Sequence, residues 1–264
     1  MNGFPDQKLK KILDDKTSGS TGLVLKLNRY FSGIASDRNK IRKSLKFIRG
    51  EFSHFTVIKN YLADFSKALN KNDEHAVKTF TGQYQKEQSE KYERLYSNAV
   101  PYLFKSKTFI TLSNSRTLEY IFIRLKKDKH IFKVIAAESR PKLEGRFLAK
   151  ALLRNNIKVE LITDAELSLF VPKADALILG ADMILKGGNI VNKTGSKSAA
   201  LLCGHYKKPV YAISTKDKIS NKKSFRPAKM NPSEIWNYSH ENLSITNIYF
   251  EMIEAELITK LITD

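Results

Sequence analysis

Several polar residues of this 264-residue chain directly follow short apolar runs, and their side chains could bind an anion and transfer protons. Arginine holds a phosphate with two parallel hydrogen bonds, and lysine offers it a compact point charge. A carboxylate can take up and return a proton. The residues concerned are Ser113, Asn114 and Ser115 after one run, Arg140 after the next, and Asp182, Asn192, Lys193 and Lys218 after later ones. Together they predict a site for a phosphorylated ligand with a carboxylate beside it.

The densest part of this pattern spans residues 174–196. Its apolar half ends in Gly180-Ala181-Asp182, which predicts a buried strand with a carboxylate at its C-terminal tip. Asn192 and Lys193 then precede a helix that we expect to begin at Gly195-Ser196, with free N–H groups for an anion. Ligands of α/β sheets bind outside the carboxyl ends of the strands, so we expect the site here.

A second candidate for anion binding lies near the N-terminus. Ser18, Gly19 and Ser20 stand just before a segment with helical spacing. Small hydroxyl residues and glycine at such a position usually cap the helix. They could equally hold a phosphate on the amides of the first turn. The local sequence favours the cap and leaves both interpretations open.

The elements that would position the strand-end residues are readable from residue 105 onward. Short apolar runs there alternate with longer amphipathic stretches, which predicts a parallel sheet with helices on both faces. We expect strands over 108–112, 132–137, 157–162, 175–179 and 210–213, and helices over 115–125, 141–155, 164–170 and 195–206.

Residues before this region have helical periodicity instead. We expect short helices around residues 9–13 and 23–31, a long pattern from a cap at Ser36-Asp37 with a break near Gly50, and a further helix from Asn72-Asp73. The chain is therefore predicted to be an α/β protein with two domains, a helical one over residues 1–104 and a sheet-containing one over residues 105–264.

Composition limits the class of protein. The chain is 42% hydrophobic and 28% charged, with a single cysteine, Cys203, which excludes an internal disulfide. No apolar run approaches the roughly 18 residues that cross a bilayer. The polar start lacks the apolar core of a signal peptide, and we expect a cytoplasmic protein. We interpret the +19 charge mainly as a solvated surface, because the basic residues are spread along the chain, with a basic face for an acidic partner as the alternative.

Common nucleotide and catalytic motifs are absent. The sequence contains neither GxGxxG nor GxxxxGK[ST], which excludes a standard dinucleotide fingerprint and a P-loop. It also lacks GxSxG and HExxH. His205 and His240 have no partners at metal-ligand spacing, so we expect no metal and no cofactor. The indole of Trp236 is expected to pack against the fold.

Four separated segments, in order, resemble one known family. They are ITLSNSRT, AAESRPKLEGR, DALILGADMILKGGNIVNKTGS and ITNIYFEMIEAELITKLITD. They look like the family of eukaryotic translation initiation factor 2B alpha, beta and delta subunits, which includes ribose-1,5-bisphosphate isomerase and methylthioribose-1-phosphate isomerase. The resemblance covers residues 105–264 well and residues 1–104 weakly. It implies a Rossmann-like C-terminal domain, dimerisation through that domain, and a sugar-phosphate or nucleotide-like pocket at the strand ends.

The resemblance also implies roles for single residues. The isomerases of the family use a cysteine and an aspartate, and Asp182 matches the aspartate. Ser113 stands where the cysteine belongs, and a serine hydroxyl has no accessible anion without a dedicated base. Cys203 lies in a predicted helix and cannot replace it. The positions that match ligand-holding ones are Ser115, Arg140, Asn192, Lys193 and Lys218, and TSGS around Ser18, Gly19 and Ser20 resembles the family's N-terminal substrate loop.

These observations support three hypotheses. The first is a protein like the alpha subunit of initiation factor 2B that binds a sugar phosphate or nucleoside monophosphate, with isomerase activity lost or reduced. It would form a homodimer or higher homo-oligomer and contact initiation-factor partners. The second is an active aldose–ketose isomerase for a ligand like ribose 1,5-bisphosphate, using Asp182 and Ser113. The third, a basic RNA-associated protein, rests on net charge alone; no membrane association is expected.

Overall fold

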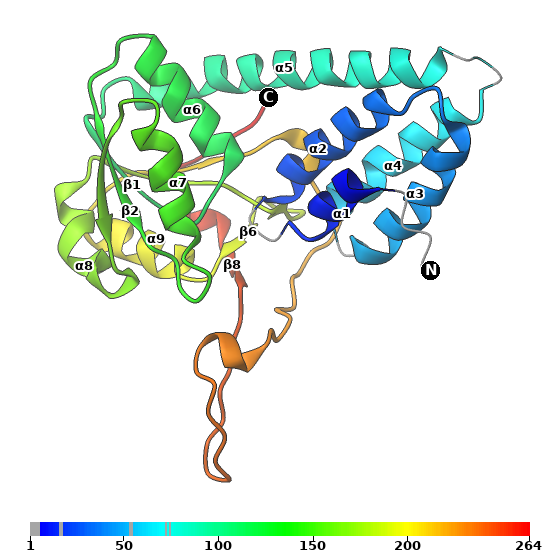
Figure 1. The fold of residues 1–264 in the computed structure, drawn as a ribbon. Helices are drawn as coiled ribbons and strands as arrows, with labels where there is room; N and C mark the ends of the chain where they lie inside the picture. Colours follow the sequence, from blue (N-terminus) through cyan, green and yellow to red (C-terminus); the bar gives the residue numbers. More distant parts are fainter. Residues whose placement is uncertain (1–5, 16–17, 53–54, 72, 74) are drawn as a thin grey trace. The chain divides into compact units, whose positions relative to one another are not determined.

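The computed structural model describes residues 6–15, 18–52, 55–71, 73 and 75–264 (Figure 1). The chain forms two compact units, Met1–Lys91 and Tyr92–Asp264, which are described separately below. Among the described residues, no helix combines the length and the apolar character that crossing a membrane requires.

Unit 1 consists of helices, as the periodicity predicts. They are α1 (Gln7–Leu13), α2 (Ser20–Gly33), α3 (Arg38–Glu51), α4 (Thr56–Leu69) and the first part of α5 (Ala76–Leu103). Asp37 caps α3 as predicted, because its carboxylate accepts a hydrogen bond of 2.8 Å from the Lys40 amide. The long apolar pattern is two helices, and α3 continues past Gly50 to Glu51.

The core of unit 1 is rich in aromatic side chains. The rings of Phe31 and Phe65 stack with their centroids 4.2 Å apart, and Tyr61 and Phe80 pack around them. Aromatic pairs in such offset arrangements add to the stability that burial of apolar area already provides.

Helix α5 belongs to both units. Its residue Val77 is part of the core of unit 1, whereas Tyr92 and Leu95 are part of the core of unit 2. The predicted domain boundary at residues 104/105 coincides with the end of α5, but the change of packing partners falls inside the helix, after Lys91. A continuous amphipathic pattern conceals such a change.

Unit 2 contains the predicted parallel sheet. Its strands are β1 (Thr108–Leu112), β2 (Lys133–Ala137), β3 (Lys158–Ile162), β4 (Ala176–Leu179), β7 (Val210–Ile213) and β9 (Lys260–Ile262). The six strands lie in the order β3-β2-β1-β4-β7-β9, and every neighbouring pair is parallel. All carboxyl ends therefore meet at one edge, and the Rossmann-like fold class is confirmed.

Helices cover both faces of this sheet (Figure 1). The end of α5, α6 (Arg116–Lys127) and α7 (Glu144–Leu153) pack on one face, and α8 (Leu167–Phe170) and α9 (Ser196–His205) pack on the other. Strand β4 feeds both cores alternately, since Ala176 and Ile178 join one cluster and Leu177 and Leu179 join the other. Because β4 is buried on both faces, all of its residues are apolar, and this continuous apolar run is the pattern from which the strand was predicted.

A second, antiparallel sheet was not predicted. It has the order β5-β6-β8 and consists of β5 (Met183–Ile184), β6 (Ile190–Lys193) and β8 (Phe250–Ile253). Gly187 and Gly188 form the turn between β5 and β6 with φ values of 102° and 90°, a conformation that side chains disfavour. This hairpin places Asn192 and Lys193 in a strand, where only a loop was expected.

A long connection joins β7 to β8 and is drawn in orange in Figure 1. Its short helices are η3 (Lys216–Lys218) and η4 (Pro232–Glu234), and the other 3₁₀ turns of the unit are η1 (Asp164–Glu166), η2 (Val171–Lys173) and η5 (Ala255–Leu257). Within this connection Trp236 is 56% exposed and stacks on Tyr238 with the ring centroids 4.5 Å apart. The expectation that the Trp236 indole packs into the fold is therefore wrong.

The start of α7 also differs from the prediction. The helix was expected from Pro141 but begins at Glu144. Leu143, the residue before it, has a φ of 57°, which is left-handed and cannot be part of a right-handed helix. The residues between β2 and α7 therefore form a loop at the carboxyl edge, and this loop carries charged side chains.

Gly145 allows α7 to lie directly on this edge. A Cβ atom there would come within 1.8 Å of the Ala137 carbonyl oxygen, so Gly145→Ala is expected to destabilise the protein by about 1–3 kcal/mol. Urea denaturation measures this effect. Gly204→Ala is the control, because its Cβ would meet nothing within 4 Å, and we expect its stability to be unchanged or slightly raised. Equal midpoints for both variants would contradict this packing argument.

Candidate functional site

The site lies where the direction of the strand connections reverses, between β1 and β4. The loop of Ser113, Asn114 and Ser115 leaves β1, and the loop of Gly180-Ala181-Asp182 leaves β4. The two loops touch, because a Cβ on Gly180 would come within 2.8 Å of the Ser115 hydroxyl oxygen. The Asp182 side chain is exposed at this position. Open α/β sheets bind their ligands in the crevice at such a switch point.

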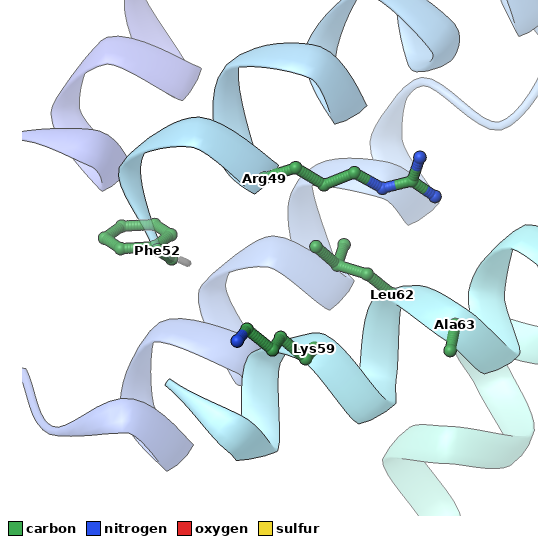
Figure 2. A pocket seen from close by; sticks show the side chains of 5 residues that line it. All are labelled: Arg49, Phe52, Lys59, Leu62 and Ala63. Carbon is green, nitrogen blue, oxygen red and sulfur yellow. The ribbon is translucent and has the colours of Figure 1, made fainter. Parts of the chain in front are cut away.

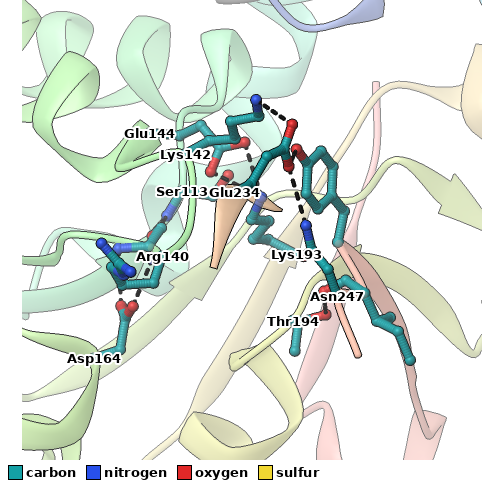
Figure 3. A network of polar contacts seen from close by, with 12 residues as sticks. Ser113, Arg140, Lys142, Glu144, Asp164, Lys193, Thr194, Glu234 and Asn247 are labelled. Atoms are coloured by element: carbon teal, nitrogen blue, oxygen red, sulfur yellow. Dashed lines mark hydrogen bonds and ion pairs between the residues drawn. The ribbon is translucent and has the colours of Figure 1, made fainter. Parts of the chain in front are cut away.

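Ser113 is held in a left-handed conformation with φ of 66°. Its amide donates a hydrogen bond of 2.6 Å to the hydroxyl of Ser139, which is buried beyond β2. Asp164, beyond β3, accepts hydrogen bonds from the amides of Ser139 (2.8 Å) and Arg140 (2.6 Å), as Figure 3 shows. The loops after three neighbouring strands are thus tied together, and the Arg140 side chain stays exposed.

Lys218, which was predicted to lie at this edge, contacts the aspartate loop. Its Nζ donates a hydrogen bond of 2.6 Å to the carbonyl of Ala181, and the Ser214 hydroxyl donates one of 3.2 Å to the same oxygen. The Asp182 amide donates to the Val191 carbonyl at 2.8 Å, which joins this loop to β6. The structure therefore places an ammonium group one residue from the proposed acid–base carboxylate.

Lys193 is buried and ion-paired. Its side chain is only 2% exposed, and its Nζ lies 2.9 Å from each carboxylate oxygen of Glu144. The same ammonium group lies 4.2 Å from the centre of the Tyr249 ring, so a cation–π contact adds to the ion pair. The expected phosphate-binding lysine therefore already has an internal counter-anion.

The first backbone amides of α9 also have a partner within the protein. One oxygen of the Glu251 carboxylate, from β8, accepts hydrogen bonds from the amides of Gly195 (2.7 Å) and Lys197 (2.9 Å). A carboxylate at a helix N-terminus is favourable because it meets the unpaired amides and the positive end of the helix dipole. The expectation of free N–H groups at Gly195-Ser196 is wrong.

Two other predicted ligand-binding residues support local structure. Asn192 is buried, and its side-chain amide donates to the Ser196 hydroxyl at 2.9 Å. Ser115 is the N-cap of α6, and its hydroxyl accepts from the Leu118 amide at 3.4 Å. Asn114 is half-buried in the same loop. A ligand role for these three residues stays a prediction.

Glu234 connects the long β7–β8 connection to the loop before α7 (Figure 3). One of its oxygens lies 2.5 Å from the Lys142 ammonium, and the other accepts hydrogen bonds from the Asn247 side chain and the Tyr249 hydroxyl. Burial alone would raise the pKa of the Glu234 carboxyl, but these hydrogen bonds outweigh it and hold the pKa below its ordinary value. Burial and the Glu234 carboxylate raise the pKa of Tyr249.

Among the residues of these contacts that the sequence reasoning missed are Glu144, Glu234, Tyr249 and Glu251. Three of them lie inside the segments that carry the family resemblance, namely AAESRPKLEGR and ITNIYFEMIEAELITKLITD. Their charge and position in those segments were the available signal. Their partners, however, are far away in the chain, 49 residues for Glu144 and Lys193.

Among the described residues, neither a histidine contact nor a substitute thiol is found beside Ser113. In the described part of the chain no contact links it to a histidine: His130 bonds the Ser106 carbonyl before β1, at the opposite edge, and His205 ends α9. Cys203 is fully buried in the core, and desolvation raises the pKa of its thiol to about 12. A thiol of that kind is inert as a nucleophile or acid at neutral pH.

The N-terminal candidates lie in unit 1. Gly19 is the N-cap of α2, so the predicted cap at this motif is confirmed, and it is formed by the backbone without a side-chain hydrogen bond. The Ser18 amide donates to Asp15 at 3.0 Å, and Ser20 is buried in the first turn. Thr17 of the TSGS motif lies outside the described residues. Phosphate binding by Ser18, Gly19 and Ser20 stays a prediction.

Unit 1 also has a hollow of about 250 Å³ on α3 and α4 (Figure 2). Two cationic and three apolar side chains line it: Arg49, Phe52, Lys59, Leu62 and Ala63. This lining provides neither a carboxylate nor a nucleophile. Among the residues described in both units, no cluster of three or more side chains could hold a metal ion.

The fold and the strand-end residues define an α/β protein with a ligand site at the switch point of a Rossmann-like sheet. A profile of the Initiation factor 2 subunit family matches residues 9–264. The chain belongs to this family, and the predicted family resemblance is confirmed.

Individual relatives include both translation factors and enzymes. The chain is 31% identical over 193 residues to a translation initiation factor eIF-2B subunit 2-like protein of Pyrococcus furiosus, covering 73% of this chain and 69% of that protein. It is 33% identical over 147 residues to methylthioribose-1-phosphate isomerase of Parabacteroides distasonis, covering 50% of this chain and 44% of the enzyme.

Solved structures show the same similarity. The translation initiation factor eIF-2B of Pyrococcus horikoshii has a TM-score of 0.76 at 26% identity, covering 97% of this chain and 93% of that one. The 5-methylthioribose 1-phosphate isomerase of the same organism has a TM-score of 0.88 at 17% identity, covering 98% and 82%, and shares the fold. Fold similarity at this level does not distinguish a factor from an enzyme.

The Glu234 network predicts a pH dependence. Because the pKa of Glu234 is lowered in the folded state, its contribution to stability is complete above the ordinary value of 4.5 and is lost as the pH falls through the lowered pKa. Glu234→Gln should therefore be less stable than the wild type at about pH 7, with a difference that shrinks towards about pH 3.

Urea unfolding at several pH values measures this difference. Glu241→Gln removes an exposed carboxylate of the same connection and should follow the wild-type pH profile. A stability difference for Glu234→Gln that stays constant across the pH range would contradict the assigned pKa direction.

Proposed function

We propose that this chain is an initiation-factor-2B-like protein that binds a phosphorylated sugar or a nucleoside monophosphate at the carboxyl edge of its sheet, with little or no isomerase activity. The observation that carries the proposal is the pairing of loops at the switch point, with Asp182 on one and Ser113 on the other. Charged side chains that could bind a ligand lie near these loops, and serine stands where the family resemblance expects the catalytic cysteine.

Binding is supported by the cations at this edge. Arg140 follows β2 with an exposed side chain, Lys218 bonds the aspartate loop, and Lys193 lies at the end of β6. An arginine fork and lysine ammonium groups are the usual protein partners of phosphate. Asp182 is exposed and able to contact a sugar hydroxyl.

Loss of turnover is supported by Ser113. Aldose–ketose conversion requires a proton or hydride to move between neighbouring carbons, with acid–base help at the oxygens. The amide of Ser113 is fixed by Ser139, but no described histidine contacts this residue to activate its hydroxyl. Asp182 would have to act alone, and an unassisted carboxylate lacks the second group that such a transfer uses.

Partners follow from the family. A solved structure with the same fold, at 15% identity, is the tetrameric eIF2B-beta2-delta2 complex of C. thermophilum. We propose a homodimer or higher homo-oligomer that contacts initiation-factor partners in the cytoplasm. A role like that of the alpha subunit would be regulatory, and ligand binding at this site would control it.

The alternative is an active sugar-phosphate isomerase. It is favoured by the retention of Asp182 at the exposed tip of β4, since a protein that only binds has less need of a carboxylate beside a phosphate. In this case the serine at position 113 would either take part in catalysis itself or suit a phosphorylated sugar that has not been assayed.

Turnover assays distinguish the two functions. Wild type is expected to leave ribose 1,5-bisphosphate and methylthioribose 1-phosphate unconverted, whereas Ser113→Cys should raise conversion of one of them by about 100-fold, because it supplies the missing acid–base group. The double variant Ser113→Cys/Asp182→Asn should lose that gain. Rapid conversion by the wild type would overturn the proposal in favour of the isomerase.

Binding is tested separately by thermal denaturation with sugar phosphates and nucleoside monophosphates. A ligand at about 100 times its Kd stabilises the folded state by roughly 2.7 kcal/mol. The shift should be strongly reduced in Arg140→Ala, whose exposed side chain is not needed for folding. Arg154→Ala, an exposed arginine at the far end of α7, is the matched control. A shift that Arg140→Ala leaves unchanged would remove this edge from the binding site.

A further inference from the structure

We propose that Glu144 determines the ligand specificity of this site: it is an internal counter-anion that a phosphate must displace from Lys193. This inference rests on the proposed binding function and adds a selection rule to it. Small anions would be rejected, and only ligands with further contacts would bind.

The geometry of the pair carries the inference. Both carboxylate oxygens of Glu144 lie 2.9 Å from the Lys193 ammonium, and the lysine side chain is 2% exposed against 21% for the glutamate. One side of the ammonium is covered by the Tyr249 ring at 4.2 Å. A phosphate can therefore approach Lys193 most readily from the side where Glu144 now lies.

The alternatives to displacement are unfavourable. A phosphate that approached with Glu144 in place would bring two anionic groups together at a buried cation, and like charges at such distances repel strongly where water is excluded. Displacement requires Glu144 to turn towards solvent. Its greater exposure and its position in the first turn of α7 permit this, whereas the buried stem of Lys193 in β6 is fixed by the strand ladder.

Lys142, which also lies at this edge, is paired with a carboxylate of the protein as Lys193 is. Lys142 pairs with Glu234 at 2.5 Å, and Glu234 is in turn bonded by Asn247 and Tyr249. Two lysines of this edge are thus neutralised by carboxylates, while the exposed Arg140 side chain makes no such pair among the described residues. Inorganic phosphate meets Arg140 without a competing carboxylate, whereas at Lys193 a sugar phosphate adds hydroxyl contacts that offset the displacement of Glu144.

The test compares Glu144→Gln with the wild type by calorimetric titration with inorganic phosphate and with ribose 5-phosphate. Glutamine keeps the shape and can still accept a hydrogen bond from Lys193, but it removes the competing charge. We expect binding of both probes to tighten by about tenfold or more, and the ratio of affinities between ribose 5-phosphate and phosphate to fall. The double variant Glu144→Gln/Lys193→Ala should lose the gain.

Glu160→Gln is the matched control, because it removes a carboxylate that pairs with Lys133 at 3.1 Å on a solvent-exposed part of the sheet. Its affinities should equal those of the wild type. Glu144→Asp is a second variant should the glutamine variant fail to fold: its side chain is too short to reach Lys193 fully, and a smaller gain is expected.

The outcomes separate the two proposals. If the wild type binds ribose 5-phosphate through Arg140 but Glu144→Gln and Glu144→Asp bind no more tightly, the specificity role is overturned and the proposed function stands. If Glu160→Gln gains as much as Glu144→Gln, general charge is responsible and the role is likewise overturned. If no variant binds any probe, the binding function fails and this inference fails with it.

Discussion

The buried ammonium of Lys193 is the constraint on which the carboxyl edge depends. A lysine that is 2% exposed loses nearly all of its hydration, and a folded protein tolerates this only with a paired, hydrogen-bonded partner. Glu144 is that partner, and the Tyr249 ring completes the enclosure. The pair links the end of β6 to the start of α7 and to the residue before β8. Elements that are distant in the chain are thereby fixed around one charge, and the loop between β2 and α7 is held over the strand ends.

The same principle recurs around this edge. Glu251 satisfies the first amides of α9, Asp164 satisfies those of the loop after β2, and Glu234 pairs with Lys142. Although the chain carries a charge of +19, two lysines near the strand ends, Lys142 and Lys193, are paired with carboxylates of the protein itself. The charges at this edge are thus partly compensated within the protein. Under the proposed function, a phosphorylated ligand would have to compete with Glu144 for Lys193, and selectivity would then be a property of the fold.

The local pattern of apolar residues was sufficient to predict the parallel sheet. Buried strands such as β4 and amphipathic helices such as α6 each have a recognisable pattern of their own. It also placed Asp182 and Lys218 correctly, since a residue that follows a parallel strand must lie at the carboxyl edge. It failed for the β5-β6-β8 sheet, whose short strands have no periodicity and pair residues such as Asn192 and Glu251 across a long connection. It failed for the free amides of α9 for the same reason, because a partner from β8 cannot be inferred from the residues around Gly195.

Ser113 and Asp182 lie on the two loops of the switch point. They lead to the central proposal, which is that a phosphorylated sugar binds here and is not converted. A crystal structure of the protein soaked with ribose 1,5-bisphosphate tests it most directly. The account predicts an unconverted aldose at the carboxyl edge, with a phosphate oxygen within hydrogen-bonding distance of Lys193 Nζ and with Glu144 turned away. Density for the ketose product, or a ligand bound elsewhere with the Lys193–Glu144 pair intact, would contradict it.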